Sequence, residues 1–328
     1  MPQKSGVFGQ GYRRYERRHN LKSVLPFLDR GRGMTLGLLP LEGKARRRWM
    51  KQFALGAVMA GMAGSVRAIS ASPIRVGMTP AFLHDQHSLL ADWRAYLQAK
   101  LEMPVEFVQR DRYRETMDLL HLGKLDFAWL CDYPFVFLKD LVRLLVVPLN
   151  QGRPYYRSLL LVGTNDQKRN SMADLEGGVF AFADPYSNTG YLAPRFRIRE
   201  MGRNPQTFFR QTFFTWSHRK VIEAVSKGFA DGGAVDSFVW DTLEKVRPDV
   251  TQGARIIERS PEYAFPPFAA HRAVPAEIFE RMQKVLIGMS QDESGRLLLK
   301  RLNLDGFIVG QRKMYDSVAK MMAAFGEI

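Results

Sequence analysis

A short polar segment that follows an apolar run is the part of this chain best suited to chemistry. Ser187, Asn188, Thr189 and Gly190 come soon after the apolar residues 178–183. The run predicts a buried strand, and the polar residues would then occupy the first turn of a helix. The first N–H groups of a helix have no partner within it and carry the positive end of its dipole, so they attract anions. The segment therefore predicts a site for phosphate-like oxygens.

Capping is the alternative, because Ser187 or Thr189 could serve only as the N-cap of the helix, a common role for these residue types. Two other polar residues, His218 and Asp236, also come where expected strands end. In open α/β sheets, ligands bind at the carboxyl ends of strands. Three such ends can converge on one ligand, and this favours binding over capping alone.

The elements that would position these residues alternate along the chain from Pro73 onward. Short apolar runs are separated by helical patterns, which is typical of α/β architecture. The expected strands are 74–78, 105–108, 126–130, 144–149, 158–162, 178–183, 213–216, 233–236 and 255–258. The expected helices are 88–101, 113–122, 219–227 and 237–246, followed by a mostly helical segment over 276–325. The pattern predicts a second unit that the chain enters from the first and later leaves to rejoin it.

The formal charge of +15 is concentrated at the front of the chain. Of 48 basic and 33 acidic residues, 14 and 3 lie in residues 1–68, which leaves 34 and 30 and a charge of only +4 for the rest. The remainder also has no basic stripe interleaved with aromatic residues. The composition therefore argues against a nucleic-acid partner for the folded part.

The front of the chain resembles an export signal. Arg46 and Arg47 are close to a twin-arginine pattern, and the weakly apolar stretch 53–66 follows them. This stretch is shorter than the ~20 residues that span a bilayer. We expect residues 1–68 to be an N-terminal extension and a twin-arginine-like signal peptide that is cleaved near Ala68, so that the mature protein is periplasmic. The general export route and a later start codon remain open.

Several segments of the body together resemble a known family. They are 123–129, 156–158, 174–177, 184–191, 217–218 and 228–236. In this order they resemble the phosphonate, phosphite and phosphate substrate-binding proteins of ABC importers, over about residues 74–307. The resemblance implies an α/β fold of the type II periplasmic-binding-protein class, with two lobes that are joined by two crossing hinge strands. The first lobe would be 73–162 plus 260–328, and the second 163–259.

The resemblance also implies roles for single residues in the second lobe. Ser187, Asn188 and Thr189 match the anion-binding turn of the family, although Asn188 stands where Thr is usual. Gly190 completes this turn. His218 matches a histidine that donates to ligand oxygens, and its alternative is a surface cap for the helix that follows it.

The opposite wall of the cleft would come from the first lobe. Tyr113 and Tyr156 are expected to contact the ligand, because tyrosine hydroxyls can donate to phosphate oxygens. Tyr133 and Trp129 are further candidates, and for Trp129 the apolar strand around it favours a place in the core.

Asp236 limits the ligands that the site could accept. A carboxylate that faces an oxyanion repels it unless one of the two carries a proton, so an acid here selects ligands with a P–OH group or an attached ammonium. A cap for the helix that begins at Ser237 is an equally good interpretation.

Cys131 is the only cysteine, so the sequence excludes an intramolecular disulfide and a thiolate zinc cluster. A lone cysteine is most often a small buried apolar residue. Relatives of this fold that sense arsenite use a thiolate, which leaves a role for Cys131 as a soft ligand open. His84 and His87 are three residues apart, which is weak evidence for a metal, and we expect none.

We therefore expect an exported, monomeric solute-binding protein that captures a small phosphorus oxyanion and delivers it to an ABC permease. The alternative is a periplasmic sensor of an oxyanion or arsenite that acts on a histidine kinase. No cofactor is implied. The body lacks a P-loop, a GxGxxG, a nucleophile elbow and an HExxH motif, so the sequence does not favour an enzyme.

Overall fold

The structure is a computed structural model that describes residues 72–79 and 87–328. The export signal and His84 lie outside these residues. The first sheet contains, in spatial order, β13 (Gly306–Ile308), β4 (Val142–Leu149), β12 (Phe268–His271), β3 (Phe127–Trp129), β1 (Ile74–Met78) and β2 (Val105–Gln109). The second contains β10 (Ala254–Arg259), β6 (Ser158–Gly163), β9 (Gly232–Asp236), β7 (Val179–Phe182) and β8 (Gln211–Phe214). Each sheet is the centre of one α/β lobe.

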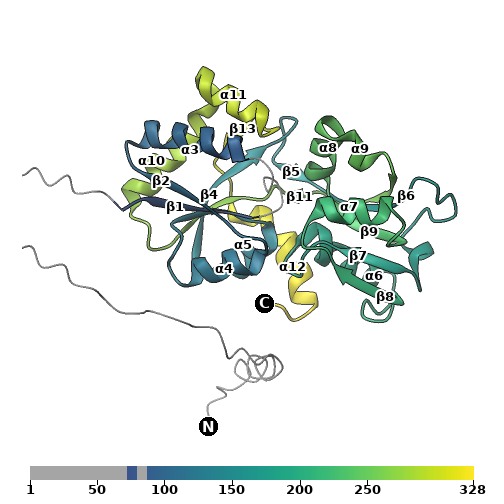
Figure 1. Cartoon of the computed structure of the whole chain (residues 1–328). Coiled ribbons are helices and arrows are strands. Elements are labelled where there is room, and N and C mark those ends of the chain that lie inside the picture. Colours follow the sequence, from purple (N-terminus) through teal and green to yellow (C-terminus); the bar gives the residue numbers. More distant parts are fainter. Residues whose placement is uncertain (1–71, 80–86) are drawn as a thin grey trace, which may run out of the picture. The chain divides into compact units, whose positions relative to one another are not determined.

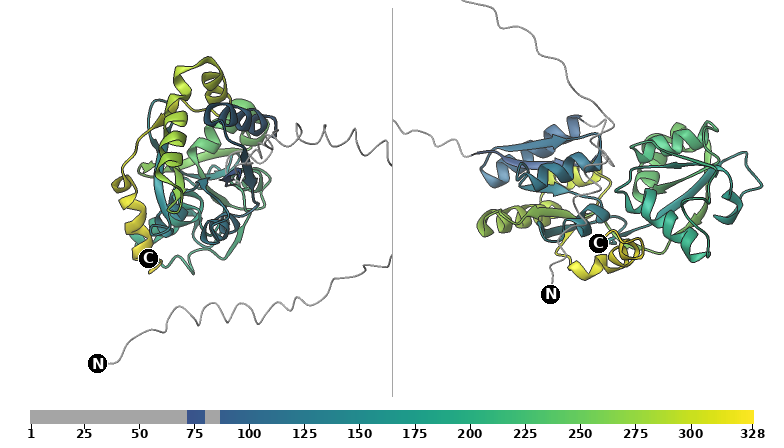
Figure 2. Two further views of the ribbon diagram at one scale, coloured as in Figure 1. Left: turned by 90° about the vertical axis from the view of Figure 1, so that its left-hand side faces the viewer. Right: turned by 90° about the horizontal axis from the view of Figure 1, so that it is seen from below.

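Helices lie on both faces of each sheet (Figures 1 and 2). The first lobe contains α3 (His87–Leu101), α4 (Tyr113–His121), α5 (Asp132–Phe137), α10 (Ala276–Gly288), η4 (Met289–Gln291), α11 (Glu293–Arg301), η5 (Arg312–Tyr315) and α12 (Asp316–Ala324). The second contains η2 (Ala173–Leu175), η3 (Asn188–Leu192), α6 (Ala193–Glu200), α7 (His218–Ser226), α8 (Ser237–Val246) and α9 (Pro248–Thr251). Strands that are covered on both faces usually have continuous apolar sequences, and β6 and β7 are examples.

The chain crosses between the lobes twice. It passes from β4 through β5 (Tyr155–Tyr156) into β6, and it returns from β10 through β11 (Tyr263–Ala264) into β12. β5 and β11 pair with each other in an antiparallel ribbon, as expected for two crossing hinge strands. The expected lobe boundary after Val162 falls inside β6, whose residues pair with β9 and β10 of the second sheet.

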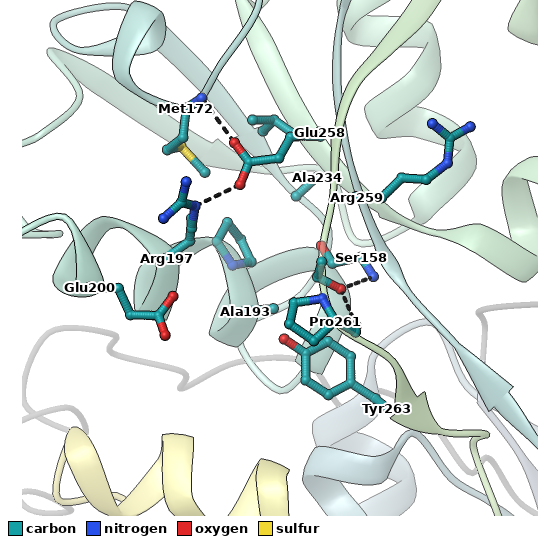
Figure 3. Close-up of a pocket in the computed structure, with 13 residues that line it drawn as sticks. Ser158, Met172, Ala193, Arg197, Glu200, Ala234, Glu258, Arg259, Pro261 and Tyr263 are labelled. Carbon is teal, nitrogen blue, oxygen red and sulfur yellow. Dashed lines mark hydrogen bonds and ion pairs between the residues drawn. The ribbon is translucent and has the colours of Figure 1, made fainter.

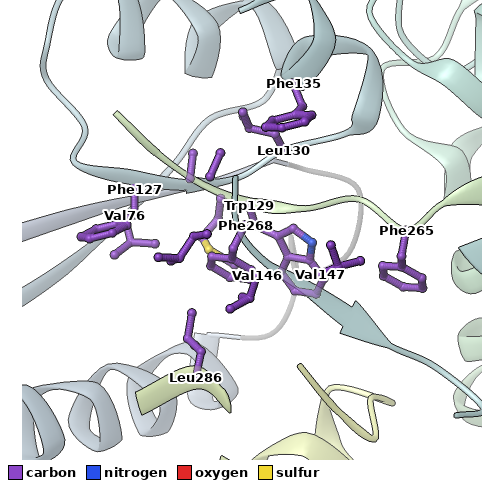
Figure 4. Close-up of a cluster of buried hydrophobic side chains, with 14 of the residues drawn as sticks. Val76, Phe127, Trp129, Leu130, Phe135, Val146, Val147, Phe265, Phe268 and Leu286 are labelled. Carbon is purple, nitrogen blue, oxygen red and sulfur yellow. The ribbon is translucent and has the colours of Figure 1, made fainter. Parts of the chain in front are cut away.

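Aromatic packing holds the first lobe together (Figure 4). Trp129 of β3 stacks on Phe268 of β12 with ring centroids 5.2 Å apart, and Trp93 of α3 meets both rings edge-on. The Trp129 indole N–H donates to the carbonyl of Pro266 at 2.9 Å. These contacts give Trp129 a place in the core, as its apolar strand favoured.

The sequence did not predict every element of the first lobe. β12 lies between β3 and β4, yet its residues Phe-Ala-Ala-His follow two prolines and include alanines, which are poor strand formers. Its place in the sheet comes from pairing with both neighbours. α5 and β13 were also missed, because both are short.

The C-terminal segment adds a further connection between the lobes. Glu327 forms an ion pair of 2.9 Å with Arg195 of α6 and accepts a hydrogen bond from the Tyr133 hydroxyl at 3.1 Å. The Arg195 guanidinium also lies over the ring of Phe325, 4.1 Å from its centroid. Chain from beyond α12 thus joins α5 of the first lobe to α6 of the second. Within the described part of the chain, no helix has both the length and the apolarity needed to span a bilayer.

Candidate functional site

Three strand ends of the second lobe meet where the sequence predicted. β7 runs parallel to β8 and to β9, so their carboxyl ends lie at one edge of the sheet. Ser187, His218 and Asp236 follow or end these strands. The Ser187 hydroxyl oxygen lies 3.5 Å from His218 Nε2, and the Asp236 N–H donates to His218 Nδ1 at 3.2 Å. The topology therefore brings together residues that are far apart in the sequence.

The anion-binding turn is a buried π-helical turn. Ser187 is its N-cap and accepts a hydrogen bond from the Gly190 N–H at 3.0 Å, and the turn continues directly into α6. The side chains of Ser187, Asn188 and Thr189 are fully buried. Ser187 thus acts as the cap that its residue type suggested. Capping uses only its oxygen as an acceptor, so its hydroxyl hydrogen remains able to donate.

His218 is a neutral donor in this arrangement. Burial lowers its pKa to about 3. Because Nδ1 accepts from the Asp236 N–H, the single ring proton must lie on Nε2. Nε2 is 3.5 Å from the hydroxyl oxygens of both Ser187 and Tyr113. The ring is 1% exposed and Ser217 occupies the N-cap position of α7, so the structure does not support the alternative of a surface cap.

The hydroxyl hydrogens around His218 are left for another acceptor. Since Nε2 carries a proton, neither Ser187 nor Tyr113 can donate to it. Tyr113 remains a hydroxyl, because burial raises its pKa well above the usual value. The Nε2–H faces both hydroxyl oxygens at 3.5 Å, and the two O–H groups, one from each lobe, are left to donate to a further acceptor. This is a donor set suited to an oxyanion.

Asp236 caps a helix and also carries a proton near neutral pH. Its Oδ1 accepts from the N–H groups of Phe238 and Val239 at 2.7 and 3.3 Å. Burial raises the pKa of its carboxyl to about 8, and nearby Asp132 adds to the shift. The two interpretations of Asp236 are therefore compatible, because a protonated carboxyl can cap α8 without repelling an anion.

Asp132 is the residue that sequence reasoning missed. It is fully buried at the start of α5, directly after β3. Its Oδ1 accepts from the Tyr156 hydroxyl at 2.7 Å and from the Cys131 thiol at 3.1 Å, and its Oδ2 accepts from the Asn188 amide at 2.7 Å. An acid at the end of a strand was the available signal, the same one that singled out Asp236.

Asp184 begins segment 184–191, which resembles the family, but it was not predicted as a site residue. Its carboxylate accepts from the backbone N–H of Tyr186 at 2.8 Å and from that of Tyr113 at 3.3 Å. The second bond ties the first turn of α4, in the first lobe, to the loop that leads into the anion-binding turn. Asp184 therefore positions Tyr113 beside His218.

Two further candidates from outside the second lobe, Tyr156 and Tyr133, take different places. Tyr156 is buried beside the site, and its hydroxyl donates to Asp132. Tyr133 turns the other way, because its hydroxyl donates to Glu327 and its ring packs on Phe137. Its expected contact with the ligand is therefore not supported.

Cys131 is a buried thiol rather than a thiolate. It is 4% exposed, and burial together with the neighbouring Asp132 charge raises its pKa well above the usual value. Thiolate chemistry is suppressed in such surroundings. Among the described residues, no group of three or more His, Cys, Asp or Glu side chains could hold a metal ion.

We expect the Cys131 thiol to react slowly with Ellman's reagent at pH 8 while the two lobes are closed. A bound ligand should slow the reaction by roughly tenfold or more, because it favours the closed lobes in which the thiol is buried. The rate in 6 M guanidinium, where the thiol is exposed, is the control. Fast labelling that a ligand leaves unchanged would contradict this placement.

Two buried polar atoms of the turn have no hydrogen-bond partner within the part of the chain that the structure describes. They are Asn188 Oδ1 and Thr189 Oγ1. Unpaired buried polar atoms are uncommon in native proteins and point to a missing partner. Both atoms belong to the turn that Ser187 caps.

A separate cavity of about 260 Å³ is lined by residues of β6, β9, β10 and α6 (Figure 3). Leu160, Met172 and Ala234 contribute to its lining, and the ion pair between Arg197 and Glu258 lies at its edge. It contains none of the predicted site residues. The nearest link is Ser158, which lines the cavity and donates its hydroxyl to the Thr189 carbonyl at 2.6 Å.

Residues 76–315 match the family model described as ABC transporter, phosphonate, periplasmic substrate-binding protein. The chain belongs to this family. Its members bind and deliver substrates rather than convert them, so the absence of an enzyme motif agrees with the assignment. Asn188 remains a departure from the Thr that is usual in the anion-binding turn.

One relative is similar in sequence, and two solved structures share the fold. The phosphate-import protein PhnD of Mycolicibacterium smegmatis is 24% identical over 228 residues, which cover 65% of this chain and 68% of that protein. The structure of PhnD1 from Prochlorococcus marinus with methylphosphonate has a TM-score of 0.71 at 19% identity and covers 78% of this chain and 98% of that one. A binding-protein component of an ABC phosphonate transporter from Pseudomonas aeruginosa has a TM-score of 0.70 at 18% identity, with 76% and 85% covered.

Proposed function

We propose that this family member is an exported solute-binding protein that captures a phosphonate, phosphite or phosphate between its lobes and delivers it to an ABC importer of the inner membrane. The observation that carries the proposal is the set of neutral donors around one buried position. The Nε2–H of His218 and the hydroxyls of Ser187 and Tyr113 come from both lobes and meet there. The phosphate that the Mycolicibacterium smegmatis relative imports and the methylphosphonate bound to the Prochlorococcus marinus protein both fit such a set.

Binding would favour closure of the lobes, because the ligand contacts both of them only when they meet. Tyr113 would approach from the first lobe while Ser187 and Thr189 hold the anion from the second. Thr189 has a buried hydroxyl oxygen without a partner within the described residues, which the ligand would supply. Asp236 would share its proton with a ligand oxygen.

The proposal includes export by the twin-arginine-like signal, cleavage near Ala68 and a monomeric mature protein. The sensor alternative is less well supported. Its arsenite form needs a thiolate at Cys131, and burial raises the pKa of that thiol.

A thermal-shift screen tests the proposal and names the ligand. The panel is phosphate, phosphite, methylphosphonate, 2-aminoethylphosphonate, sulfate and arsenite. A ligand at 100 times its Kd stabilises the folded state by about 2.7 kcal/mol, which corresponds to a rise in Tm of roughly 5–10 °C for a protein of this size. We expect such a rise with at least one phosphorus oxyanion. A response to arsenite alone, lost in Cys131→Ser, would overturn the proposal.

A further inference from the structure

We propose that Asp132 is a positioning residue that sets ligand specificity by turning the side-chain carbonyl of Asn188 toward the ligand, so that the site accepts only oxyanions that carry a donor hydrogen. This inference rests on the proposed function and names the ligand class within it. It concerns two residues that contact each other across the lobes, Asp132 in the first and Asn188 in the second.

The direction of the Asn188 amide follows from the chemistry of its partner. An ionised carboxylate can only accept hydrogen bonds. The Asp132 Oδ2 lies 2.7 Å from the amide nitrogen of Asn188, so the NH₂ group must face the acid. The carbonyl oxygen Oδ1 is then turned away from Asp132.

Hydrogen bonds fix the position of the Asp132 carboxylate, so this carboxylate can in turn fix the side-chain amide of Asn188. Its other oxygen, Oδ1, accepts from the Tyr156 hydroxyl, the Cys131 thiol and the backbone N–H of Tyr133, at distances between 2.7 and 3.1 Å. These three donors all come from outside the second lobe. Oδ2 is left to receive the Asn188 amide.

The side-chain carbonyl oxygen of Asn188 is the atom of this pair that matters for the ligand. It is buried and has no hydrogen-bond partner within the described part of the chain. A buried acceptor that stays unpaired is unfavourable, and a ligand that brings a hydrogen to it is favoured over one that does not. Ser187 and Thr189 on either side can donate, whereas this oxygen can only accept.

The site therefore combines donors for ionised oxygens with one fixed acceptor. A monoprotonated phosphonate, phosphite or phosphate has both kinds of group, and so does an aminoalkylphosphonate. Sulfate at neutral pH has no hydrogen and would leave the Asn188 oxygen unpaired. A site of this type rejects an analogue that lacks the required hydrogen more strongly than its shape alone would allow.

Calorimetric titrations with methylphosphonate, phosphate and sulfate test the proposal, and the measured quantity is the ratio of the phosphorus-ligand affinity to the sulfate affinity. In Asp132→Asn, the new amide can accept as well as donate, so Asn188 is free to rotate. We expect the ratio to fall about 10- to 100-fold, the range that one unpaired buried group produces. Asn188→Thr, which removes the carbonyl, should lower the ratio similarly, and the double variant should lower it no further.

Asp249→Asn is the matched control, since this acid lies at the surface beside Arg247 and should leave the ratio within twofold of wild type. If Asp132→Asn fails to fold, Asn188→Thr alone still tests the claim. An unchanged ratio in both variants, with all affinities lowered together, would mean that the pair only joins the lobes and would overturn the proposal. Failure of the wild-type protein to bind any phosphorus ligand would instead refute the proposed function.

Discussion

Above pH 8, Asp236 is expected to lower ligand affinity about tenfold for each pH unit, in addition to the effect of the ligand's own ionisation, and Asp236→Asn should lose this added fall. The carboxyl of Asp236 is fully buried, and burial raises its pKa to about 8, with a further contribution from the charges of Asp132 and Asp241. Below that pH it is neutral beside the anion. Above it, binding must either take up a proton or place two negative charges together.

Calorimetry between pH 6 and 10 measures this effect. Asparagine caps helices as well as aspartate does, so α8 should persist in the variant. The ligand's own ionisation affects wild type and variant equally, and the difference between the two curves isolates Asp236. Parallel curves would show that Asp236 does not carry the proton.

The same proton makes folding depend on pH. The folded pKa lies above the ordinary value of 3.8, so the folded state binds more protons than the unfolded state between about pH 4 and 8. The free energy of unfolding should therefore decrease across this window as the pH rises, by up to about 1.4 kcal/mol per pH unit from this group. Urea melts of wild type and Asp236→Asn compare the two slopes.

Gly190→Ala is expected to lower ligand affinity about 100-fold and stability by about 1–3 kcal/mol. A Cβ atom at this position would lie 2.5 Å from the Cβ of Ala183 and 2.9 Å from Cε1 of His218. Backbone packing fixes Ala183, so the turn and the His218 ring must move apart. This displaces the Ser187 hydroxyl and the Nε2–H together.

Gly288→Ala is the control for this variant. Gly288 is the last residue of α10, and an added Cβ would meet nothing within 4 Å among the described residues. Alanine there should leave binding unchanged and leave stability equal or up to about 1 kcal/mol higher. Calorimetry and thermal melts measure both quantities. Wild-type affinity in Gly190→Ala would show that the turn does not hold the ligand.

The sequence predicted the second lobe well because its signals are local. Apolar runs marked β6, β7 and β9, and the polar residues after them were recognised from their position at strand ends. Parallel pairing then brings those ends to one edge, which is a property of the α/β topology and needs no further information. Ser187, His218 and Asp236 were found in this way.

The parts that could not be predicted depend on partners that are distant in the sequence. The side-chain direction of Tyr133 follows from Glu327, which is 194 residues away. The role of Asp132 follows from Asn188 in the other lobe, and from sequence alone it was one acid among many. The protonation of Asp236 depends on burial, which only the assembled lobes produce.

The most direct test of the central claim is a calorimetric titration of wild type, Ser187→Ala and Ser226→Ala with the phosphorus oxyanion that raises Tm most. Ser226 lies in the same lobe at the end of α7, and its hydroxyl bonds only weakly to the Val250 carbonyl, at 3.4 Å. Loss of a hydrogen bond to a charged group corresponds to about 1.5–3 kcal/mol, so Ser187→Ala should bind roughly 10- to 150-fold more weakly, while Ser226→Ala binds as wild type does. Equal affinity in all three proteins would place the ligand outside this turn and contradict the account.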